Sequence, residues 1–370
     1  MRSSSPGSLH LFTLILVIVI TATAGCTGDH SSPKMDILVS KYDSGGQDTW
    51  NTAIDSGKDD YATAIIETSD GGYAIGGWIS ENHGYPNNPR VIRLDTTGRI
   101  VWDRSLDSSE VYSVAIAEAP DGGYIVAHNI NNFDSGKISR IDADGRQVWN
   151  RTVDSAFKTI TPTRDGRFVL AGTRTFLIEG NGTTVWDRPF SSTSVLPAAG
   201  GGFFAERSGV PYSGGELFRL DANGTVLWTR PVGSHEMGKI TSVRETPEGS
   251  IEVIFTYADP ARNKGVVLFM ESEQITLGKN GTVTNSIPLV AVDPLTRTSD
   301  GGYLFAAYPF PDSAAFTTLP HANSNLHLVR LSHQGSVVWD RSLDLPSWAA
   351  PQSVLPVRDG GFVTLVVTGS

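Results

Sequence analysis

The sequence predicts an all-β fold, because two short patterns typical of β-hairpins alternate along almost the whole chain. The first pattern is Asp-x-x-Gly-x-x-x-Trp, and its clearest copy lies within residues 91–104. The second is Asp-Gly-Gly followed by an aromatic residue, with its clearest copy at 70–73. Each pattern occurs seven times with some substitutions, so we expect fourteen antiparallel two-stranded ribbons joined by tight turns.

The first pattern has the features of a strand, a tight turn and a second strand. Residues 91–95 alternate in the period of two expected of a strand. Asp95 can accept a hydrogen bond from the backbone two residues later, and Gly98 supplies the positive φ that the turn requires. The turn glycine and the tryptophan position recur at Gly46/Trp50, Gly98/Trp102, Gly145/Trp149, Gly182/Trp186, Gly224/Trp228, Gly281/Asn285 and Gly335/Trp339.

The strand after this turn carries apolar side chains on both faces. Ile100 and Trp102 share one face and Val101 lies on the other, which predicts a sheet covered on both sides. Trp102 and Arg104 are two residues apart and therefore share a face. We expect the tryptophans to be buried structural residues, and the arginines to stack on a ring or to pair with a carboxylate.

The second pattern also reads as a hairpin. Its turns begin at Asp70, Asp121, Asp165, Gly200, Glu248, Asp300 and Asp359. The residues that follow these turns are Tyr73, Tyr124, Phe168, Phe203, Ile251, Tyr303 and Phe362, aromatic in six of the seven copies.

The order of the hairpins predicts a closed ring. Glycines of the first pattern from Gly98 to Gly335 are 47, 37, 42, 57 and 54 residues apart, and a period near 40–50 with four strands is typical of a propeller blade. Residues 35–54 form a first hairpin alone, and residues 350–370 form a second hairpin alone. We therefore expect a seven-bladed β-propeller over residues 36–370, made of four-stranded antiparallel blades and closed by pairing of the N-terminal half-blade with the C-terminal half-blade.

The first 25 residues have the features of a secretory leader. An apolar run from Leu11 to Ile20 is followed by small residues and by Cys26, the only cysteine of the 370 residues, so no intramolecular disulfide can form. The region resembles a prokaryotic lipoprotein signal, in which Cys26 would be lipidated and residues 26–35 would be a tether. An ordinary secretory signal and an uncleaved anchor remain alternatives. All three readings place the rest of the chain outside the cytoplasm.

The formal net charge is −10. Nucleic-acid binding needs a basic surface, so the charge argues against a nucleic-acid partner.

The tryptophan repeat resembles that of PQQ-like propellers, and the Asp-Gly-Gly-Tyr repeat resembles propeller lipoproteins of the prokaryotic cell envelope. Two departures limit what this resemblance implies. The quinoprotein repeat has one more residue between Asp and Gly, and one cysteine cannot form the vicinal disulfide of many of those enzymes. The resemblance therefore implies the architecture, and we expect neither a cofactor nor a metal.

Candidate binding residues lie in the longer connections, which emerge opposite the tight turns if both kinds of turn share one end. These connections are 80–90, 128–136, 207–215, 257–265 and 308–325. Function concentrates on loops held by a rigid scaffold, and aromatic, His and Asn side chains suit recognition of sugars or peptides. The candidates are His83, Tyr85, His128, Asn132, Phe133, Tyr212, Tyr257, Arg262, Tyr308, Phe310 and His321.

The four Asn-x-Thr sequons would be glycan acceptors in an exported archaeal or eukaryotic chain. They begin at Asn150, Asn181, Asn223 and Asn280, and three of them also fit the turn chemistry of Asn-Gly.

The sequence contains no complete motif of catalysis or metal binding. Residues 233–239 nearly form a phosphate loop, but Ile240 stands where Ser or Thr should be and a strand follows. The sequence thus favours a lipid-anchored, non-catalytic binding or scaffolding module whose partner is an envelope protein or a surface glycan. The alternative is a propeller enzyme, either a quinoprotein-like oxidoreductase or a polysaccharide-active hydrolase or lyase.

Overall fold

The computed structural model describes residues 34–81, 87–106, 111, 113–130, 135–208, 214–233, 238–258, 270–289, 295–307, 326–343, 345 and 348–369. The chain divides into two units, Met1–Pro33 and Lys34–Ser370, and every described residue belongs to the second. Within these ranges all regular structure is β, as predicted. The described part of the chain has no helix with the length and hydropathy needed to cross a bilayer.

The strands form seven four-stranded antiparallel sheets, which we number as blades 1 to 7. Blade 1 consists of β27 (Trp348–Pro356), β28 (Phe362–Gly369), β1 (Met35–Tyr42) and β2 (Asp48–Ile54). Blade 2 consists of β3 (Asp59–Glu67), β4 (Tyr73–Ser80), β5 (Asn87–Leu94) and β6 (Ile100–Ser105). Blade 3 consists of β7 (Val114–Glu118), β8 (Tyr124–Ile130), β9 (Ser135–Ile141) and β10 (Gln147–Val153).

The remaining blades repeat this plan. Blade 4 consists of β11 (Phe157–Pro162), β12 (Phe168–Gly172), β13 (Thr175–Ile178) and β14 (Thr184–Arg188). Blade 5 consists of β15 (Ser194–Pro197), β16 (Phe203–Ser208), β17 (Gly215–Leu220) and β18 (Val226–Val232). Blade 6 consists of β19 (Gly238–Glu245), β20 (Ile251–Ala258), β21 (Met270–Leu277) and β22 (Val283–Leu289). Blade 7 consists of β23 (Leu295–Arg297), β24 (Tyr303–Ala307), β25 (Leu326–Leu331) and β26 (Val337–Leu343).

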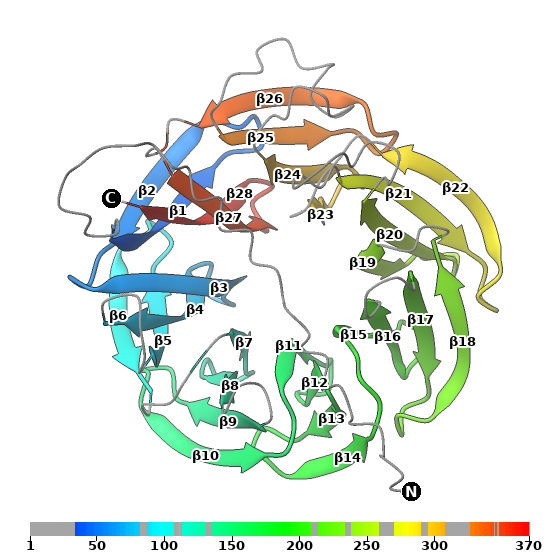
Figure 1. The fold of residues 1–370 in the computed structure, drawn as a ribbon, viewed down its shortest axis with the longest axis horizontal. Coiled ribbons are helices and arrows are strands. Elements are labelled where there is room, and N and C mark those ends of the chain that lie inside the picture. The colour runs from blue at the N-terminus through cyan, green and yellow to red at the C-terminus, as the bar shows by residue number, and fades with distance from the viewer. Residues whose placement is uncertain are drawn as a thin grey trace, which may run out of the picture. The chain divides into compact units, whose positions relative to one another are not determined.

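The seven blades form a closed ring (Figure 1). Each blade contacts the next, and blade 7 contacts blade 1 through β24 and β27. Blade 1 closes the ring, because β1 pairs with β28 along its whole length, from Met35 opposite Gly369 to Tyr42 opposite Phe362. The predicted pairing of the first and last half-blades is confirmed.

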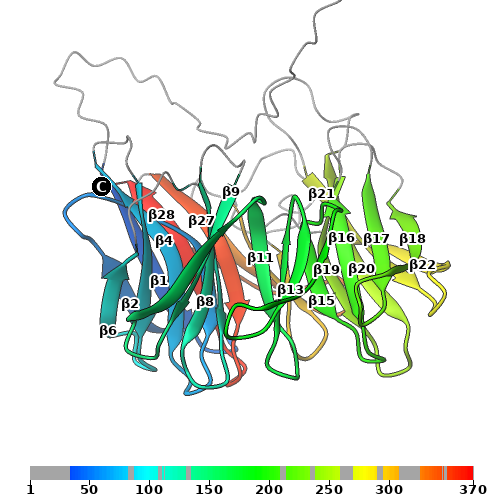
Figure 2. The ribbon, with the colours of Figure 1, turned by 90° about the horizontal axis from the view of Figure 1, so that it is seen from below.

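The tight turns of both sequence patterns lie at one end of the ring, which we call the turn end (Figure 2). In blade 2, for example, the register places Glu67, Tyr73, Leu94 and Ile100 at one level. The turn glycines have positive φ, 85° at Gly71 and 80° at Gly98. The connections from β4 to β5 and their equivalents therefore leave from the opposite end of the strands, which we call the loop end.

Each tryptophan of the first pattern packs on the turn glycine of the next blade. A methyl group on Gly98 would lie 2.5 Å from Cε3 of Trp50, and one on Gly145 would lie 2.9 Å from Cε3 of Trp102. Glycine is therefore required at this position because it has no side chain, which leaves space for the indole and allows the positive φ. The remaining docked pairs are Trp149 with Gly182, Trp186 with Gly224, Trp228 with Gly281 and Trp339 with Gly46.

The second sequence pattern supplies the other contact of this dock. The Trp102 ring packs edge-on against Tyr124 of the next blade at 6.0 Å between centroids, and its Nε1 donates to the carbonyl of Ala143 at 2.9 Å. Trp186 repeats both contacts with Phe203 and with the carbonyl of Ala222. The two repeats are therefore two halves of one joint between neighbouring blades.

The joint between blades 6 and 7 lacks this dock. Asn285 stands at the tryptophan position of β22, and the side chain nearest to Gly335 is Leu289 at 3.4 Å. Apolar packing of Ile254, Leu289, Leu295 and Phe305 joins these two blades instead.

An arginine on the third strand ties the two turns of its own blade together. Arg93 donates to the carbonyl of Tyr73 at 3.2 Å and to both carboxylate oxygens of Asp70, at 2.5 and 2.6 Å. Arg140 and Arg330 make the same set of contacts in blades 3 and 7. The Asp of the Asp-Gly-Gly turn therefore has a partner that depends on the fold as well as on the turn.

The outermost strands differ from the prediction. Trp102 and Trp186 are buried as expected, whereas the other four tryptophans of the repeat, Trp50, Trp149, Trp228 and Trp339, are only partly buried. Ile100 and Val101 are 46% and 59% exposed. These strands form the perimeter of the ring. Ile100 does not share the covered face of Trp102, because the register of β5 with β6 shifts between Arg93 and Leu94. The expected stacking of the nearby arginines is confirmed for Arg188 over Trp186 and Arg230 over Trp228.

We predict that Trp102→Ala lowers the free energy of unfolding by about 3–5 kcal/mol, because it leaves a cavity between blades 2 and 3. Urea denaturation followed by circular dichroism measures this change. Val101→Ala is the matched control on the same strand and should change stability by less than about 0.5 kcal/mol. Equal effects of the two substitutions would contradict the docking role of Trp102.

Candidate functional site

Of the eleven residues predicted for ligand-binding loops, the structure describes two, and both lie in strands. His128 is on β8 and is 1% exposed, so the prediction that it lies on a loop was wrong. Tyr257 is on β20, where it stacks on Phe255 and its hydroxyl donates to Glu271 at 3.3 Å. The other nine lie outside the described residues: His83, Tyr85, Asn132, Phe133, Tyr212, Arg262, Tyr308, Phe310 and His321.

The strands reach further toward the loop end than the sequence predicted. Polar residues extend them because cross-blade hydrogen bonds satisfy these side chains. Asn87 donates to the carbonyl of Val111 at 3.0 Å. Asn129 donates to the carbonyl of Phe157 at 2.9 Å and accepts from the Phe157 amide. Polar character was therefore a poor guide to where the connections begin.

The predicted modification sites lie in different settings. Cys26 falls outside the described residues. Asn181, Asn223 and Asn280 are exposed at the turn end, and Asn150 is exposed on β10. In two of these turns the side-chain oxygen also stabilises the backbone, because Asn181 accepts from the Thr183 amide and Asn280 from the Thr282 amide. These contacts support the turn role, and use of the sequons stays a prediction.

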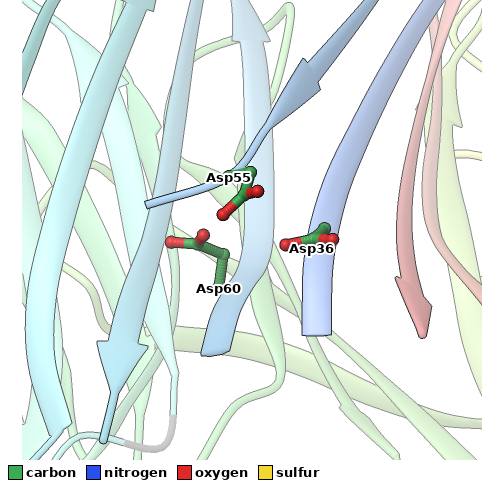
Figure 3. A group of neighbouring side chains, drawn as sticks. All are labelled: Asp36, Asp55 and Asp60. Carbon is green, nitrogen blue, oxygen red and sulfur yellow. The ribbon is translucent and has the colours of Figure 1, made fainter. Parts of the chain in front are cut away.

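Three carboxylates gather at the loop end between blades 1 and 2 (Figure 3). They belong to Asp36, Asp55 and Asp60, and one oxygen from each lies within 4.8 Å of the others. Two cations pair with this cluster. Lys34 pairs with Asp36 and Asp55, and the buried Asp60 pairs with Arg90.

A backbone amide and a fourth carboxylate also take part in this network of hydrogen bonds and ion pairs. The Ser56 amide donates to Asp60 at 2.7 Å, and Arg90 also grips Asp103 with Nε at 2.7 Å. Burial raises the pKa of Asp60, although the Ser56 amide and Arg90 oppose this, whereas the hydrogen bond from Lys34 lowers the pKa of Asp55. The cluster is explained as an ion-pair network that fastens the first blade joint, and we assign it no metal.

A second group of ionisable side chains centres on Glu206 of β16. Glu206 is the fourth residue of the second strand in its blade and is 9% exposed. The same position faces the core between neighbouring blades throughout the ring. Elsewhere it holds small or apolar residues: Gly76, Ala127, Ala171, Ile254, Ala306 and Leu365.

A cavity of about 240 Å³ lies beside Glu206, between blades 5 and 6. Ser194 and Leu196 of β15 and Phe204 and Glu206 of β16 line one side. Residues 241–243 of β19 line the other side. The register of β19 shifts between Ile240 and Ser242, and such a bulge re-aims side chains, so two consecutive hydroxyl residues, Thr241 and Ser242, both reach the cavity.

The Glu206 carboxyl is poorly solvated. Its Oε2 is buried and has no hydrogen-bond partner among the described residues. Burial raises the pKa of Glu206 to about 8, although the charges of Lys239 and Lys158 act in the opposite direction. Partial desolvation also lowers the pKa of Lys158, whose side chain is still exposed to solvent at a bulge in β11 of blade 4. Perturbed groups of this kind concentrate at functional sites.

Sequence reasoning missed Glu206 because no motif surrounds it. The signal was nevertheless present in the repeat: aligning the seven second hairpins places a single carboxylate in a column of small and apolar residues. A break in a repeat at a buried position was more informative here than the polarity of the connections.

The comparisons with known proteins agree with this architecture. Residues 87–250 match the family model described as outer membrane protein assembly factor BamB. The fold is that of a PQQ-like propeller. No curated protein matches the chain.

Solved structures similar to this propeller share its fold at low identity. A streptogramin B lyase has a TM-score of 0.54 at 12% identity, over 90% of this chain and 98% of the other. Virginiamycin B lyase from Staphylococcus aureus has a TM-score of 0.52 at 13% identity, over 82% and 94%. The Neurospora crassa Pan2 WD40 domain has a TM-score of 0.51 at 12% identity, over 84% and 89%. At these identities the similarity shows the fold alone.

We predict that Arg90→Met lowers the free energy of unfolding by about 3–5 kcal/mol, because it leaves the carboxylate of Asp60 buried without its cation. Lys58→Met, which removes the cation of the exposed pair with Glu81, is the control and should cost less than about 1 kcal/mol. Chemical denaturation at pH 7 measures both. A loss for Arg90→Met no larger than the control would show that Asp60 does not depend on Arg90.

We also predict that Glu206 makes the propeller less stable as the pH rises. Its pKa of about 8 in the folded state lies above the ordinary value of 4.5, so the folded state binds the extra proton between these values. Stability from this group is therefore complete below pH 4.5 and is lost as the pH rises to about 8. Relative to Glu206→Gln, the wild type should lose roughly 1.4 kcal/mol per pH unit in this window.

Denaturation series of wild type and Glu206→Gln at pH 5 to 9 measure this difference, and the comparison cancels the other titrating groups. Parallel pH profiles would mean that the Glu206 carboxyl titrates normally.

Proposed function

We propose that this propeller is an extracytoplasmic binding module, held at the membrane by lipid on Cys26, that presents its loop end to a protein of the cell envelope. The observation that carries the proposal is the difference between the two ends of the ring. At the turn end, short turns are occupied by the chain's own tryptophans and arginines. The connections that vary in length from blade to blade leave from the loop end.

Two further observations support this role. Residues 87–250 match a family described as an outer membrane protein assembly factor, and a protein partner at the envelope fits that description. Charged groups also gather where strands end at the loop end, among them Lys34, Asp55 and the Lys58–Glu81 pair. Exposed charges at the rim of an interface steer association and set its specificity.

The test is capture of partners from detergent-solubilised envelope by the full-length protein. We expect one or more envelope proteins to be recovered, and recovery to fall at least fivefold when residues 308–325 are replaced by a short Gly-Ser linker. Arg146→Ser, an exposed charge change at the turn end, is the control and should leave recovery unchanged. If recovery of the partner is unchanged by the loop replacement but falls with Arg146→Ser, the interface lies at the turn end and the proposal is wrong.

The anchor is tested separately, by fractionation. Cys26→Ser should move the protein from the membrane fraction to the soluble extracytoplasmic fraction. Continued membrane association of this variant would favour an uncleaved anchor over lipidation.

A second candidate function is favoured by one observation, the pair of Glu206 and Lys158. Their pKa values are shifted toward neutrality in opposite directions, which is a property of acid–base catalysts. Cleavage of a polysaccharide that is abolished by Glu206→Gln would support an enzyme. Unchanged polysaccharide profiles would leave the binding role.

A further inference from the structure

Glu206 is unusual because it occupies a repeat position, the fourth residue of the second strand, that is small or apolar in the other six blades. In six blades the fourth residue of the second strand packs against the next blade, as Gly76 does against Val114 and Ala127 does in a core with Phe157. Only blade 5 places an ionisable group there, and it does so beside a cavity. A buried polar atom without a partner costs stability, so the position is poorly explained by packing alone.

The cavity walls combine two kinds of surface. Ser194, Thr241 and Ser242 offer three hydroxyl groups that can donate or accept, whereas Leu196, Phe204 and Val243 offer apolar contact. An apolar face combined with hydroxyl groups suits a sugar ring, which has C–H groups on its faces and hydroxyls at its edge. The volume of about 240 Å³ is below that of typical drug-sized sites and restricts the occupant to a single small unit.

Two lysines act on the carboxyl group beside the cavity. Lys158 on β11 and Lys239 on β19 are the charged groups that act on Glu206. Arg207 and Glu216, the nearest charged neighbours on β16 and β17, pair with each other. The Glu206 carboxyl is protonated at neutral pH and can donate a hydrogen bond. In a chain of net charge −10, this is a local positive site.

We propose that the cavity between blades 5 and 6 binds a small hydroxylated carboxylate of the hexuronic acid class, with its carboxylate placed between Glu206 and the two lysines. The protonated Glu206 donates to one ligand oxygen, and the lysines supply the opposite charge. The ligand hydroxyls bond to Ser194, Thr241 and Ser242, and the ring lies against Phe204. The bulge in β19 brings Thr241 to the site, and the charge of Lys158 on β11 acts on Glu206.

Isothermal titration of the purified full-length protein with D-glucuronate, D-glucose and D-glucosamine tests this proposal. Glucuronate should bind at least about tenfold more tightly than glucose at pH 7, which is the scale of one charge-assisted hydrogen bond. Its affinity should fall about tenfold or more between pH 7 and pH 9, as Glu206 ionises beside the ligand. Equal affinity for glucuronate and glucose, or tighter binding of glucosamine, would overturn the proposal.

Three variants separate the contributions. Lys158→Met should weaken glucuronate binding about tenfold, whereas Lys279→Met, an exposed change in the blade 6 turn at the other end, should have no effect. Glu206→Gln keeps the shape and a donor, so binding at pH 7 should stay within about threefold while the loss between pH 7 and pH 9 becomes smaller. Circular dichroism confirms folding of each variant. Equal losses for Lys158→Met and Lys279→Met would refute a local site.

This inference extends the binding role proposed above without depending on the anchor or on the envelope partner. Replacement of residues 308–325 should abolish partner capture and leave glucuronate binding intact. A protein that captures its partner but shows no preference for glucuronate would retain the proposed function and lose only this site.

Discussion

The ring depends on the packing of one aromatic ring over one glycine at the joint between neighbouring blades. Trp102 has room only because Gly145 carries no side chain, and it is held in place by Tyr124 and by the carbonyl of Ala143. A buried indole contributes several kcal/mol of apolar burial in gross terms, and six such joints recur around the ring. This contact joins each of these blades to the next at the turn end.

Much of the fold was predictable because the same turn and strand features recur in every blade. The turn glycines, the alternation before them and the unpaired hairpins at the two ends were sufficient for seven blades and for closure in blade 1. The error on the outer strands has a simple cause. Val101 is apolar and β-branched, which suits a strand whether or not its face is covered, so composition could not show that β6 lies at the perimeter.

The site was harder to predict, because its properties come from residues far apart in the sequence. Glu206 and Thr241 line one cavity from two blades, and the charge of Lys158 acts on Glu206 from a third, so only the ring brings these residues together. His128 shows the converse, since a residue type associated with binding is buried on β8. The acidic cluster of Asp36, Asp55 and Asp60 likewise became intelligible only once Lys34 and Arg90 were seen beside it. Residue type alone indicated which interactions a side chain could make, whereas its burial and its neighbours determined which interactions it makes.

The absence of tryptophan from one joint makes the ring mechanically uneven. Where Asn285 replaces the indole, β22 and Gly335 are held by smaller apolar groups and by no ring stacked on the turn. A circle with one weak seam opens at that seam first, so amide protons flanking it are expected to exchange with solvent through a local opening cheaper than global unfolding. The first and last strands of the ring, β1 and β28, pair in blade 1, which is the neighbour of blade 7 on the side away from this joint. Blade 7 therefore lies between the joint without tryptophan and the blade that closes the ring.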